Sequence, residues 1–509
     1  MINGKFLAGG SLGSSHIDLI LSMRWGTSET VFVGARRYHM GHTIIDKLWN
    51  QHLVADLGDG TTLVYIDRIF LHERTGSIAL KSLEIDDRHV RNAKQVFCTM
   101  DHIVDTTPAR SDSTRVPGGT AFIKTTRNAA HAAGINLFDL GDDRQGIVHV
   151  VSPEQGIALP GVTLVCPDSH TCTVGGIGAL AWGIGSTEAE HALATKTLVV
   201  RKPATMRVIF DGDTPYGVTA KDMILHLIGK YSASGGAGYA IEFSGEAISA
   251  MPVEARLTLC NMAIEFGAWT GIIAPDDKTF EYIRGRPYAP TGEAWERAIG
   301  HWRSLISDPN ANFDREIRID VAQIVPQITW GTSPQHEAGI DQRVPNPAEE
   351  LDPNRRLAIE RALEYMGLEP DTPLEGIPVD AAFIGSCTNS RLSDLRNAAR
   401  ILQGRNVARG VKAICVPGSS QVKLAAEAEG LDRIFTEAGF EWRESGCSMC
   451  FFAGGESFGL EERVVTSTNR NFENRQGPHT RSHLASATTV AASAVLGKLA
   501  DVRKLDQQE

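Results

Sequence analysis

Three of the eight cysteines are spaced as ligands of a metal centre would be. Cys447 and Cys450 form a C-x-x-C pair, and Cys387 lies in a Gly-Ser-Cys-Thr-Asn-Ser loop after the apolar run 381–384. A strand that leads into this loop puts Cys387 at its carboxyl end, where α/β folds bind ligands. Three thiolates are one too few for a closed zinc site or a four-cysteine iron–sulfur site, but they suit a cubane with one open iron. Spacing alone also allows a C-x-x-C pair without metal, or a zinc site completed by a histidine.

Two Asp/His pairs could supply acid–base chemistry. In Asp101-His102 and in Asp168-Ser169-His170 the carboxylate can orient an imidazole and hold it charged. Glu265, four residues after Asn261, would share a helical face with it. Taken singly, such residues more often form surface pairs or salt bridges.

These residues require a scaffold, and the chain alternates short apolar runs with helical patterns. The runs 148–151, 162–165, 206–210, 381–384 and 411–416 predict buried strands. Segments 189–198, 222–228, 355–365 and 392–402 predict helices, and Thr43 could cap another that begins at Ile44. The alternation predicts α/β layers with parallel or mixed sheets.

Length and composition limit the classes of protein. The 509 residues are enough for two or three domains, and 42% hydrophobic with 22% charged residues is typical of globular chains. A net charge of −11 argues against a nucleic-acid binder, and no apolar stretch is long enough for a membrane helix. Eight cysteines are too sparse for a secreted disulfide scaffold, so a cytoplasmic location is expected.

We expect four parts along the chain. Residues 1–39 form an N-terminal extension that is predicted to pack poorly, because they show no clear amphipathic period. Three α/β domains follow at 40–204, 205–345 and 346–509, with the proline- and charge-rich stretch 345–356 as a linker.

Taken together and in order, the motifs resemble the aconitase superfamily from about Met40 to Val502. The sequences around Cys387, around Cys447 and Cys450, and around Asp168 are similar to its cluster and active-site motifs. Between Val218 and Glu441 the chain is close to bacterial isopropylmalate dehydratase large subunits. The resemblance implies the three-layer α/β domains 1–3 of the aconitase iron–sulfur core, with the swivel domain absent.

The same resemblance implies a hydro-lyase with one [4Fe–4S] cluster on Cys387, Cys447 and Cys450. It implies catalytic roles for Asp101, His102, His149, Asp168, His170 and Glu265. It implies substrate binding by His72, Ser169, Asn261, Asn469, Arg470 and Arg475. Most of these side chains are expected to face outward into an open cleft. The expected reaction is dehydration and rehydration of a hydroxy-acid, with isomerisation of isopropylmalate as the first expectation.

The family's catalytic base, a serine in a Gly-Ser-Ser-Arg type motif, has no match in this sequence. Segments 13–16 and 418–421 contain Gly-Ser-Ser but lack the arginine. The base is therefore expected from a small, swivel-domain partner subunit. Departures from the family at Pro167, Val174, 451–455 and Asn474 leave the cluster ligands unchanged and bear on the substrate.

Three alternatives stay open at this point. The first is a paralogous hydratase for methylmalate, dimethylmaleate or homocitrate-type substrates. The second, an iron sensor that binds RNA, is disfavoured by the acidic charge. The third, an electron-transfer subunit, would require a fully thiolate-ligated cluster.

Overall fold

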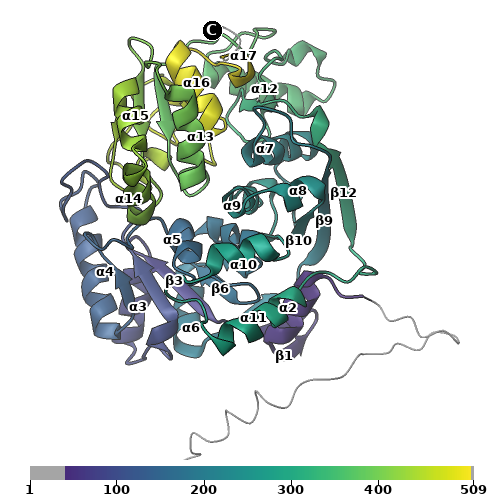
Figure 1. The fold of residues 1–509 in the computed structure, drawn as a ribbon, viewed down its shortest axis with the longest axis vertical. Helices are drawn as coiled ribbons and strands as arrows, with labels where there is room; N and C mark the ends of the chain where they lie inside the picture. The colour runs from purple at the N-terminus through teal and green to yellow at the C-terminus, as the bar shows by residue number, and fades with distance from the viewer. Residues whose placement is uncertain (1–40, 506–509) are drawn as a thin grey trace, which may run out of the picture.

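The computed structural model describes residues 41–505, which form three parts, each built on a parallel sheet (Figure 1). The first sheet has the strand order β5-β4-β3-β6-β7. Its strands are β3 (Arg68–His72), β4 (Val96–Thr99), β5 (Asn136–Phe138), β6 (Thr163–Cys166) and β7 (Leu180–Gly183). Strands β4 and β6 are buried along their whole length, as expected for strands covered on both faces.

The sheet near the C-terminus repeats this arrangement, in the order β17-β16-β15-β18-β19. Its strands are β15 (Ala381–Ile384), β16 (Lys412–Cys415), β17 (Phe440–Trp442), β18 (Arg463–Thr466) and β19 (Arg481–Leu484). In both sheets the first strand in the chain is central, the next two lie on one side, and the last two lie on the other. Such a reversal creates a crevice at the carboxyl ends of the central strands, where open α/β sheets bind ligands.

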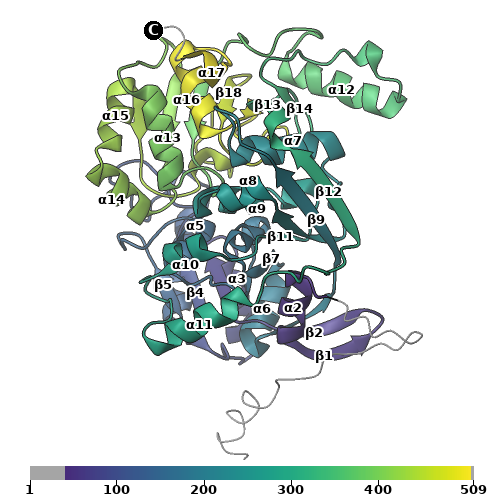
Figure 2. The same cartoon turned by 45° about the vertical axis from the view of Figure 1, so that its right-hand side comes forward.

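A four-stranded parallel sheet, β11-β10-β9-β12, lies between these two parts in the chain and at the right of Figure 1. Its strands are β9 (Ala204–Asp211), β10 (Tyr239–Ser244), β11 (Thr270–Ile272) and β12 (Arg315–Asp320). Two small antiparallel sheets complete the strands: β1 (Leu53–Gly58), β2 (Thr61–Tyr65) and β8 (Thr197–Arg201) form one, and β13 (Gln327–Thr329) with β14 (Glu337–Gly339) forms the other. Figure 2 shows β1 and β2 beside α2 at the edge of the molecule.

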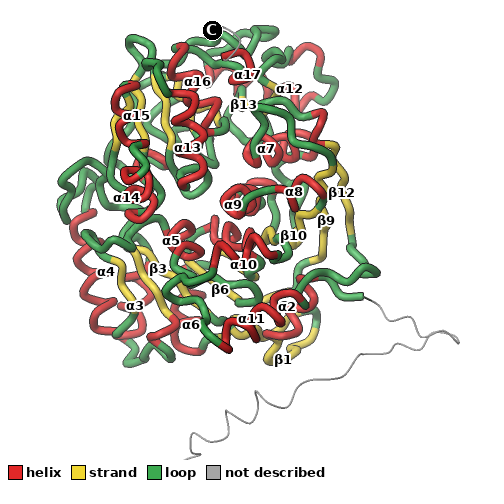
Figure 3. Tube along the Cα trace, in the orientation of Figure 1, coloured by secondary structure: helices red, strands yellow, loops and turns green. Residues whose placement is uncertain are grey.

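Helices cover the parallel sheets (Figure 3). In the N-terminal half they are α2 (Ile44–His52), α3 (Gly76–Ile85), α4 (Gly119–Ala133), α5 (Val148–Glu154), α6 (Ser186–Thr195), α7 (Ala220–Tyr231), α8 (Glu246–Ala250) and α9 (Val253–Asn261). The rest are α10 (Asp277–Ile283), α11 (Glu293–Arg303), α12 (Pro353–Met366), α13 (Leu392–Leu402), α14 (Ser420–Ala428), α15 (Leu431–Ala438), α16 (Ala487–Leu496) and α17 (Val502–Leu505). None of the helices in residues 41–505 is long and apolar enough to cross a bilayer.

Three large hydrophobic cores correspond to the three parallel sheets. Helices α10 and α11 follow β11 in the chain, yet Phe280, Trp295 and Trp302 pack into the first core. The boundaries at 204 and 345 remain a proposal, and the extension 1–39 lies outside the described residues. Residues 345–356 contain a short 3-10 turn, Pro347–Glu349, and the start of α12.

Most predicted elements are confirmed, with one clear error. The cap on α2 is present: Thr43 and Asp46 form a capping box. Residues 148–151, predicted as a strand, are the first turn of α5. All seven residues of α5 are buried, and a short, fully buried apolar run has the same composition in a helix as in a strand. The helix predicted at 189–198 ends at Thr195, and Leu198 lies in β8.

The last turn of α2 is joined to the first sheet by a pair that requires a charged histidine. His52 Nε2 lies 2.7 Å from Asp67 Oδ2, and Nδ1 lies 2.7 Å from the Leu48 carbonyl oxygen. Burial alone lowers the pKa of His52, but the hydrogen bond to Asp67 outweighs it and the pKa is raised. Burial alone raises the pKa of Asp67, and the same bond lowers it.

This pair predicts a pH-dependent loss of stability. A raised histidine pKa gives stability that is complete below its ordinary pKa of about 6.5 and is lost as pH rises through the folded value. A lowered Asp67 pKa gives stability that is lost as pH falls through its own folded value. We expect His52→Gln to lower the free energy of unfolding by about 1 kcal/mol near pH 6 and by less near pH 9. Urea unfolding at both pH values measures this, with His191→Gln on the exposed face of α6 as the control. An equal loss at both pH values would contradict it.

Candidate active site

The candidate site lies between the carboxyl ends of the first and last parallel sheets. In the first sheet, β3 ends at His72, and β4 and β6 end shortly before Asp101 and Asp168. In the last sheet, β15, β17 and β18 end before Cys387, Cys447 and Asn469. The two sets of loops are bonded through backbone: the Cys447 N–H donates to the Asp101 carbonyl oxygen at 2.8 Å, and the Glu444 N–H donates to the Thr106 carbonyl oxygen at 2.8 Å. The site is therefore formed jointly by loops of the first and last sheets.

The three predicted cluster cysteines converge. Cys387, Cys447 and Cys450 are 6–7% exposed, belong to one packed group, and form no disulfide. Ser386 Oγ lies 3.9 Å from Cys387 Sγ and 3.2 Å from Cys450 Sγ, so it joins the two loops. Ser386 is a non-glycine residue with φ +80°, a strained conformation of the kind found at functional loops. Burial raises the pKa of Cys387 to about 12, and the nearby Cys450 adds to the rise.

The spread of the three thiols favours a cluster over a single ion. One tetrahedral zinc ion with Zn–S bonds of about 2.3 Å draws its sulfurs to within about 4 Å of one another. Within residues 41–505, the group of potential ligands that lie within 4.8 Å of one another is His72, Glu73, Asp101 and His102, and it contains no cysteine. Three neighbouring buried cysteines whose sulfurs are not all within 4.8 Å of one another fit a polynuclear iron–sulfur group with three thiolate ligands.

Asp101 and His102 form a charged pair beside Cys447, whose sulfur lies 3.9 Å from Asp101 Oδ2. His102 Nδ1 lies 2.6 Å from Asp101 Oδ1, and Asp101 Oδ2 accepts from the Val148 N–H at 3.0 Å. Burial alone lowers the pKa of His102, but the Asp101 carboxylate, with Cys447, holds it well above its ordinary value. Burial alone raises the pKa of Asp101, and the charge of His102 lowers it. This arrangement favours the protonated form of the His102 imidazole beside the thiols.

Asp168 is the centre of a second network. Its Oδ1 lies 2.8 Å from His149 Nε2 and accepts from the His170 N–H at 2.8 Å, and its Oδ2 lies 3.2 Å from His102 Nε2. Burial alone raises the pKa of Asp168, but the charge of His149 and the hydrogen bonds from the histidines hold it well below its ordinary value. Ser169 Oγ lies 3.4 Å from His170 Nδ1. One carboxylate thus contacts the imidazoles of His102 and His149 and the backbone of His170.

Glu265 extends this network to Arg470. Glu265 Oε1 lies 2.8 Å from His170 Nε2 and accepts from Arg470 Nε at 2.8 Å. Burial alone raises the pKa of Glu265, and the bond to His170 lowers it. Asn261 donates to Cys387 Sγ at 3.1 Å, and Asn469 Nδ2 lies 3.5 Å from the same sulfur. The predicted shared helical face is wrong, because α9 ends at Asn261 and Glu265 lies in the following 3-10 turn, Ile264–Phe266.

His72 lies in the site, and its side chain is buried against neighbouring residues. Its ring stacks on His102 with centroids 4.0 Å apart, and Nε2 lies 3.2 Å from the Pro167 carbonyl oxygen. Burial, with the charge of His102, lowers the pKa of His72 to about 4, so it is neutral at pH 7. The neighbouring Glu73 was not predicted. Its carboxylate accepts from the Asp101 and Ile103 N–H groups and fixes the loop that carries His102.

Arg475 is bordered by two aromatic rings, and one of them, Phe451, lies in a segment where the sequence departs from the family. Its guanidinium carbon lies 5.5 Å from the ring centroid of Phe451 and 5.3 Å from that of Phe472, and the Arg74 carbon lies 5.1 Å from Phe451. Arg475 Nε is buried without a hydrogen-bond partner. Asn474 has φ +66°, which explains why glycine is usual there and why asparagine is tolerated.

Sequence reasoning also missed Lys221, which shapes the loop after β18. This fully buried lysine on α7 donates to the carbonyl oxygens of Ser467 and Thr468, next to Asn469. Burial lowers the pKa of Lys221 to about 7. Its charge in the largely apolar 220–228 helix, beside Asp222, was the one available signal.

The expectation of an outward-facing cleft is wrong for three residues. Asp101, His149 and His170 are 0%, 2% and 5% exposed in the chain by itself. Hydrogen bonds between carboxylate and imidazole groups of the site replace hydrogen bonds to water, which offsets the cost of burial. His102, Asp168 and Arg470 keep partial exposure, with 12%, 17% and 27% of their side chains accessible.

Comparisons with known proteins identify the family of the chain. A family model described as Aconitase family (aconitate hydratase) matches residues 46–497. The α/β fold and the site define a hydro-lyase, and the chain belongs to the aconitase family. It is 55% identical over 467 residues to the 3-isopropylmalate dehydratase large subunit 1 of Bradyrhizobium diazoefficiens, which covers 92% of this chain and 98% of that protein.

A solved structure, the holo-form of Thermococcus kodakaraensis aconitase X, matches with a TM-score of 0.45 and 11% identity over 98% of this chain and 100% of that chain. A likeness of this size carries no weight for function. The family model and the relative confirm the predicted family, the fold class and the hydro-lyase class.

Proposed function

We propose that the chain is the large subunit of a 3-isopropylmalate dehydratase. It would interconvert 2-isopropylmalate and 3-isopropylmalate through the unsaturated acid, a step of leucine biosynthesis. The observation that carries the proposal is the convergence of three buried thiols with the Asp101–His102 and Asp168–His149 pairs in one site. The identity to a 3-isopropylmalate dehydratase large subunit supports the choice of substrate. Eight unpaired cysteines support a cytoplasmic location.

Cys387, Cys447 and Cys450 would hold a [4Fe–4S] cluster, which when bound supplies a Lewis acid for the substrate hydroxyl. His102, kept charged by Asp101, would donate its proton to the leaving hydroxyl. Asp168 would hold His149 and His170 in position around it. Glu265 would complete this acid–base set through its bond to His170.

The remaining site residues would bind and orient the substrate. Arg470 donates a hydrogen bond from Nε to Glu265, so its terminal nitrogens would bind one substrate carboxylate. Arg475 would bind the other carboxylate. The remaining polar contacts to the substrate would come from Ser169, Asn261, Asn469 and His72. The base that removes the carbon-bound proton would come from a small partner subunit. Ser419 and Ser420 do not supply it, because Ser419 caps α14 and bonds Glu154, and Ser420 bonds Ser445.

The proposal is tested by an anaerobic assay of the chain with its small subunit on a panel of malate derivatives. Formation of the unsaturated acid is followed by its ultraviolet absorbance. We expect kcat/KM for isopropylmalate to exceed that for methylmalate by about 10-fold or more, as a larger apolar substituent allows. Preference for methylmalate, dimethylmalate or homocitrate would favour a paralogous hydratase. No dehydration of any member would overturn the assignment.

A further inference from the structure

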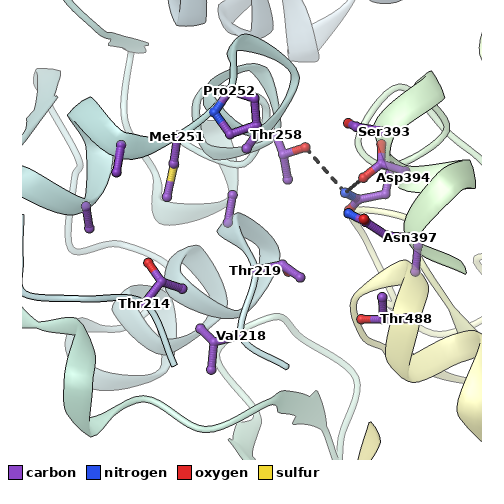
Figure 4. Close-up of a pocket in the computed structure, with 16 residues that line it drawn as sticks. Thr214, Val218, Thr219, Met251, Pro252, Thr258, Ser393, Asp394, Asn397 and Thr488 are labelled. Atoms are coloured by element: carbon purple, nitrogen blue, oxygen red, sulfur yellow. Dashed lines mark hydrogen bonds between the residues drawn. The ribbon is translucent and has the colours of Figure 1, made fainter. Parts of the chain in front are cut away.

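Two cavities border the loops that carry the cysteines. The larger has a volume of about 350 Å³ and lies between α7, α8 and α9 on one side and α13 and α16 on the other (Figure 4). None of the described residues proposed for catalysis or substrate binding lines it. The smaller, of about 30 Å³, is lined by both His102 and Phe451. The open space beside the proposed proton donor is therefore bounded by the segment that follows Cys450.

The ring of Phe451 lies between two groups that the proposed mechanism uses. Its centroid is 5.6 Å from the centroid of the His102 ring and 5.5 Å from the guanidinium carbon of Arg475. His102 is the proposed proton donor, and Arg475 is a proposed carboxylate ligand. A substrate held by both must therefore lie close to the Phe451 ring, and a side chain that rests on this ring is within reach of it.

Arg74 places a further guanidinium group on the same ring. Its guanidinium carbon lies 5.1 Å from the Phe451 centroid, and its side chain is exposed. Arg74 comes two residues after the end of β3, the central strand of the first sheet. The preceding residue, Glu73, accepts from the N–H groups of Asp101 and Ile103. The backbone at Arg74 is therefore held to the loop that carries the proposed proton donor.

No carboxylate of the described chain neutralises Arg74. Within residues 41–505, the Phe451 ring is the one partner of its guanidinium group. Arg475 has no ion pair in this part of the chain either, and its side chain contacts two aromatic rings and Cys450 Sγ, at 3.8 Å. In a chain with a net charge of −11, two guanidinium groups without a carboxylate partner beside one ring form a local site for an anion.

Contact with the ring leaves the hydrogen-bond donors of the two arginines available. An aromatic ring attracts a guanidinium group electrostatically through its π face. The five N–H donors of the guanidinium group form a rigid planar fork that matches the geometry of a carboxylate. Phe451 can therefore hold Arg74 and Arg475 near one another without neutralising the charge of either.

We propose that Arg74 binds a carboxylate of the substrate together with Arg475, and that Phe451 positions both guanidinium groups. This inference rests on the proposed function, and it defines the ligand class as dicarboxylates. Arg470 binds the other carboxylate. Three arginines for two carboxylates make the site selective for a dianion over a monoanion of similar size.

Calorimetric titration of the anaerobically prepared complex of the chain with its small subunit measures this binding without turnover. The probes are succinate, methylsuccinate and isopropylsuccinate, which lack the leaving hydroxyl, and 4-methylpentanoate as a monocarboxylate. We expect Arg74→Gln to raise the Kd of the tightest dicarboxylate about 10-fold or more, as loss of a hydrogen bond between charged groups does. The Kd of 4-methylpentanoate should change by less than about 3-fold, because it has one carboxylate and Arg470 remains to bind it.

Three further variants test the role of each group. Arg74→Lys keeps the charge and loses the planar fork, so it should restore only part of the affinity. Phe451→Leu keeps an apolar side chain and removes the ring, so the Kd of the dicarboxylate should rise several-fold. Arg297→Gln changes an arginine in an exposed ion pair with Glu293 on α11, and as the matched control it should leave every Kd unchanged.

The outcomes separate this inference from the proposed function. If the wild-type complex prefers succinate or methylsuccinate to isopropylsuccinate, the proposed substrate is wrong, yet a 10-fold rise in Arg74→Gln would still support the role of Arg74. A Kd within twofold of wild type for every dicarboxylate would overturn that role. Weaker binding of the small subunit with an unchanged Kd would assign Arg74 to the subunit interface and would also overturn it. A wild-type complex that binds none of the dicarboxylates would overturn both proposals.

Discussion

Replacing Cys447 with serine is expected to remove both the iron–sulfur group and the catalytic activity. Cys447 is buried in the same core as Cys387 and Cys450, and Asp101 Oδ2 is 3.9 Å from its sulfur. A serine hydroxyl is a poorer ligand for iron than a thiolate. Only two of the three thiolates that would hold the cluster then remain. We expect activity to fall by more than about 10²-fold, beyond the 10–100-fold that changes in outer-shell partners cause.

Iron and sulfide content and the visible absorbance of anaerobically prepared protein measure the loss directly. The control is Cys98→Ala in β4, a buried cysteine that lies in the first core and away from the three thiols. It should keep its brown colour and its turnover. A Cys447→Ser protein with full iron content, or wild-type protein that binds one zinc ion in preference to iron, would contradict the ligand assignment.

The isolated chain is expected to bind its cluster and to turn over negligibly. In the proposed mechanism His102 would donate a proton and two arginines would bind carboxylates, but Asp168, Glu265 and Asp101 are each engaged with imidazoles. A carboxylate with a lowered pKa is a weak base, so none of them is suited to remove a carbon-bound proton. General-base catalysis contributes about 10² to 10⁴ in rate.

Titrating the purified chain with its small subunit measures this contribution. The rate of dehydration should rise from near zero to a plateau at equimolar partner, while the iron content of the chain stays constant. A partner whose motif serine is changed to alanine should still bind and should restore no activity. Robust turnover by the isolated chain would require a base within residues 41–505 and would refute the dependence on a partner.

Much of the fold could be predicted because strands and helices here have different lengths and flanks. The strand at 381–384 and the helix at 392–402 have the predicted bounds, since a Gly-Ser loop separates them. The run at 148–151 could not be assigned in this way. Its helix is set by tertiary contacts, in particular Asp101 Oδ2 on the Val148 N–H, and such contacts leave no local pattern.

The structure brings the predicted site residues together, but the geometry between them could not be predicted. Motif order identified Asp168 and Glu265, but only the folded chain shows that His170 joins them. Glu73 and Lys221 act through backbone groups of other loops, so their roles depend on distant partners that no spacing reveals. Burial of Asp101 and His149 followed from mutual pairing, which a count of polar residues does not indicate.

The backbone bond between Cys447 and Asp101 joins residues that are 346 positions apart, and it has a consequence for maturation. The three cysteines proposed to hold the cluster come together only when nearly the whole chain is present, so the cluster would be inserted after synthesis. In the folded chain these three residues are only 6–7% exposed. A cluster that is added to the folded chain would therefore require the two loops to open locally, whereas one added before the loops close would not.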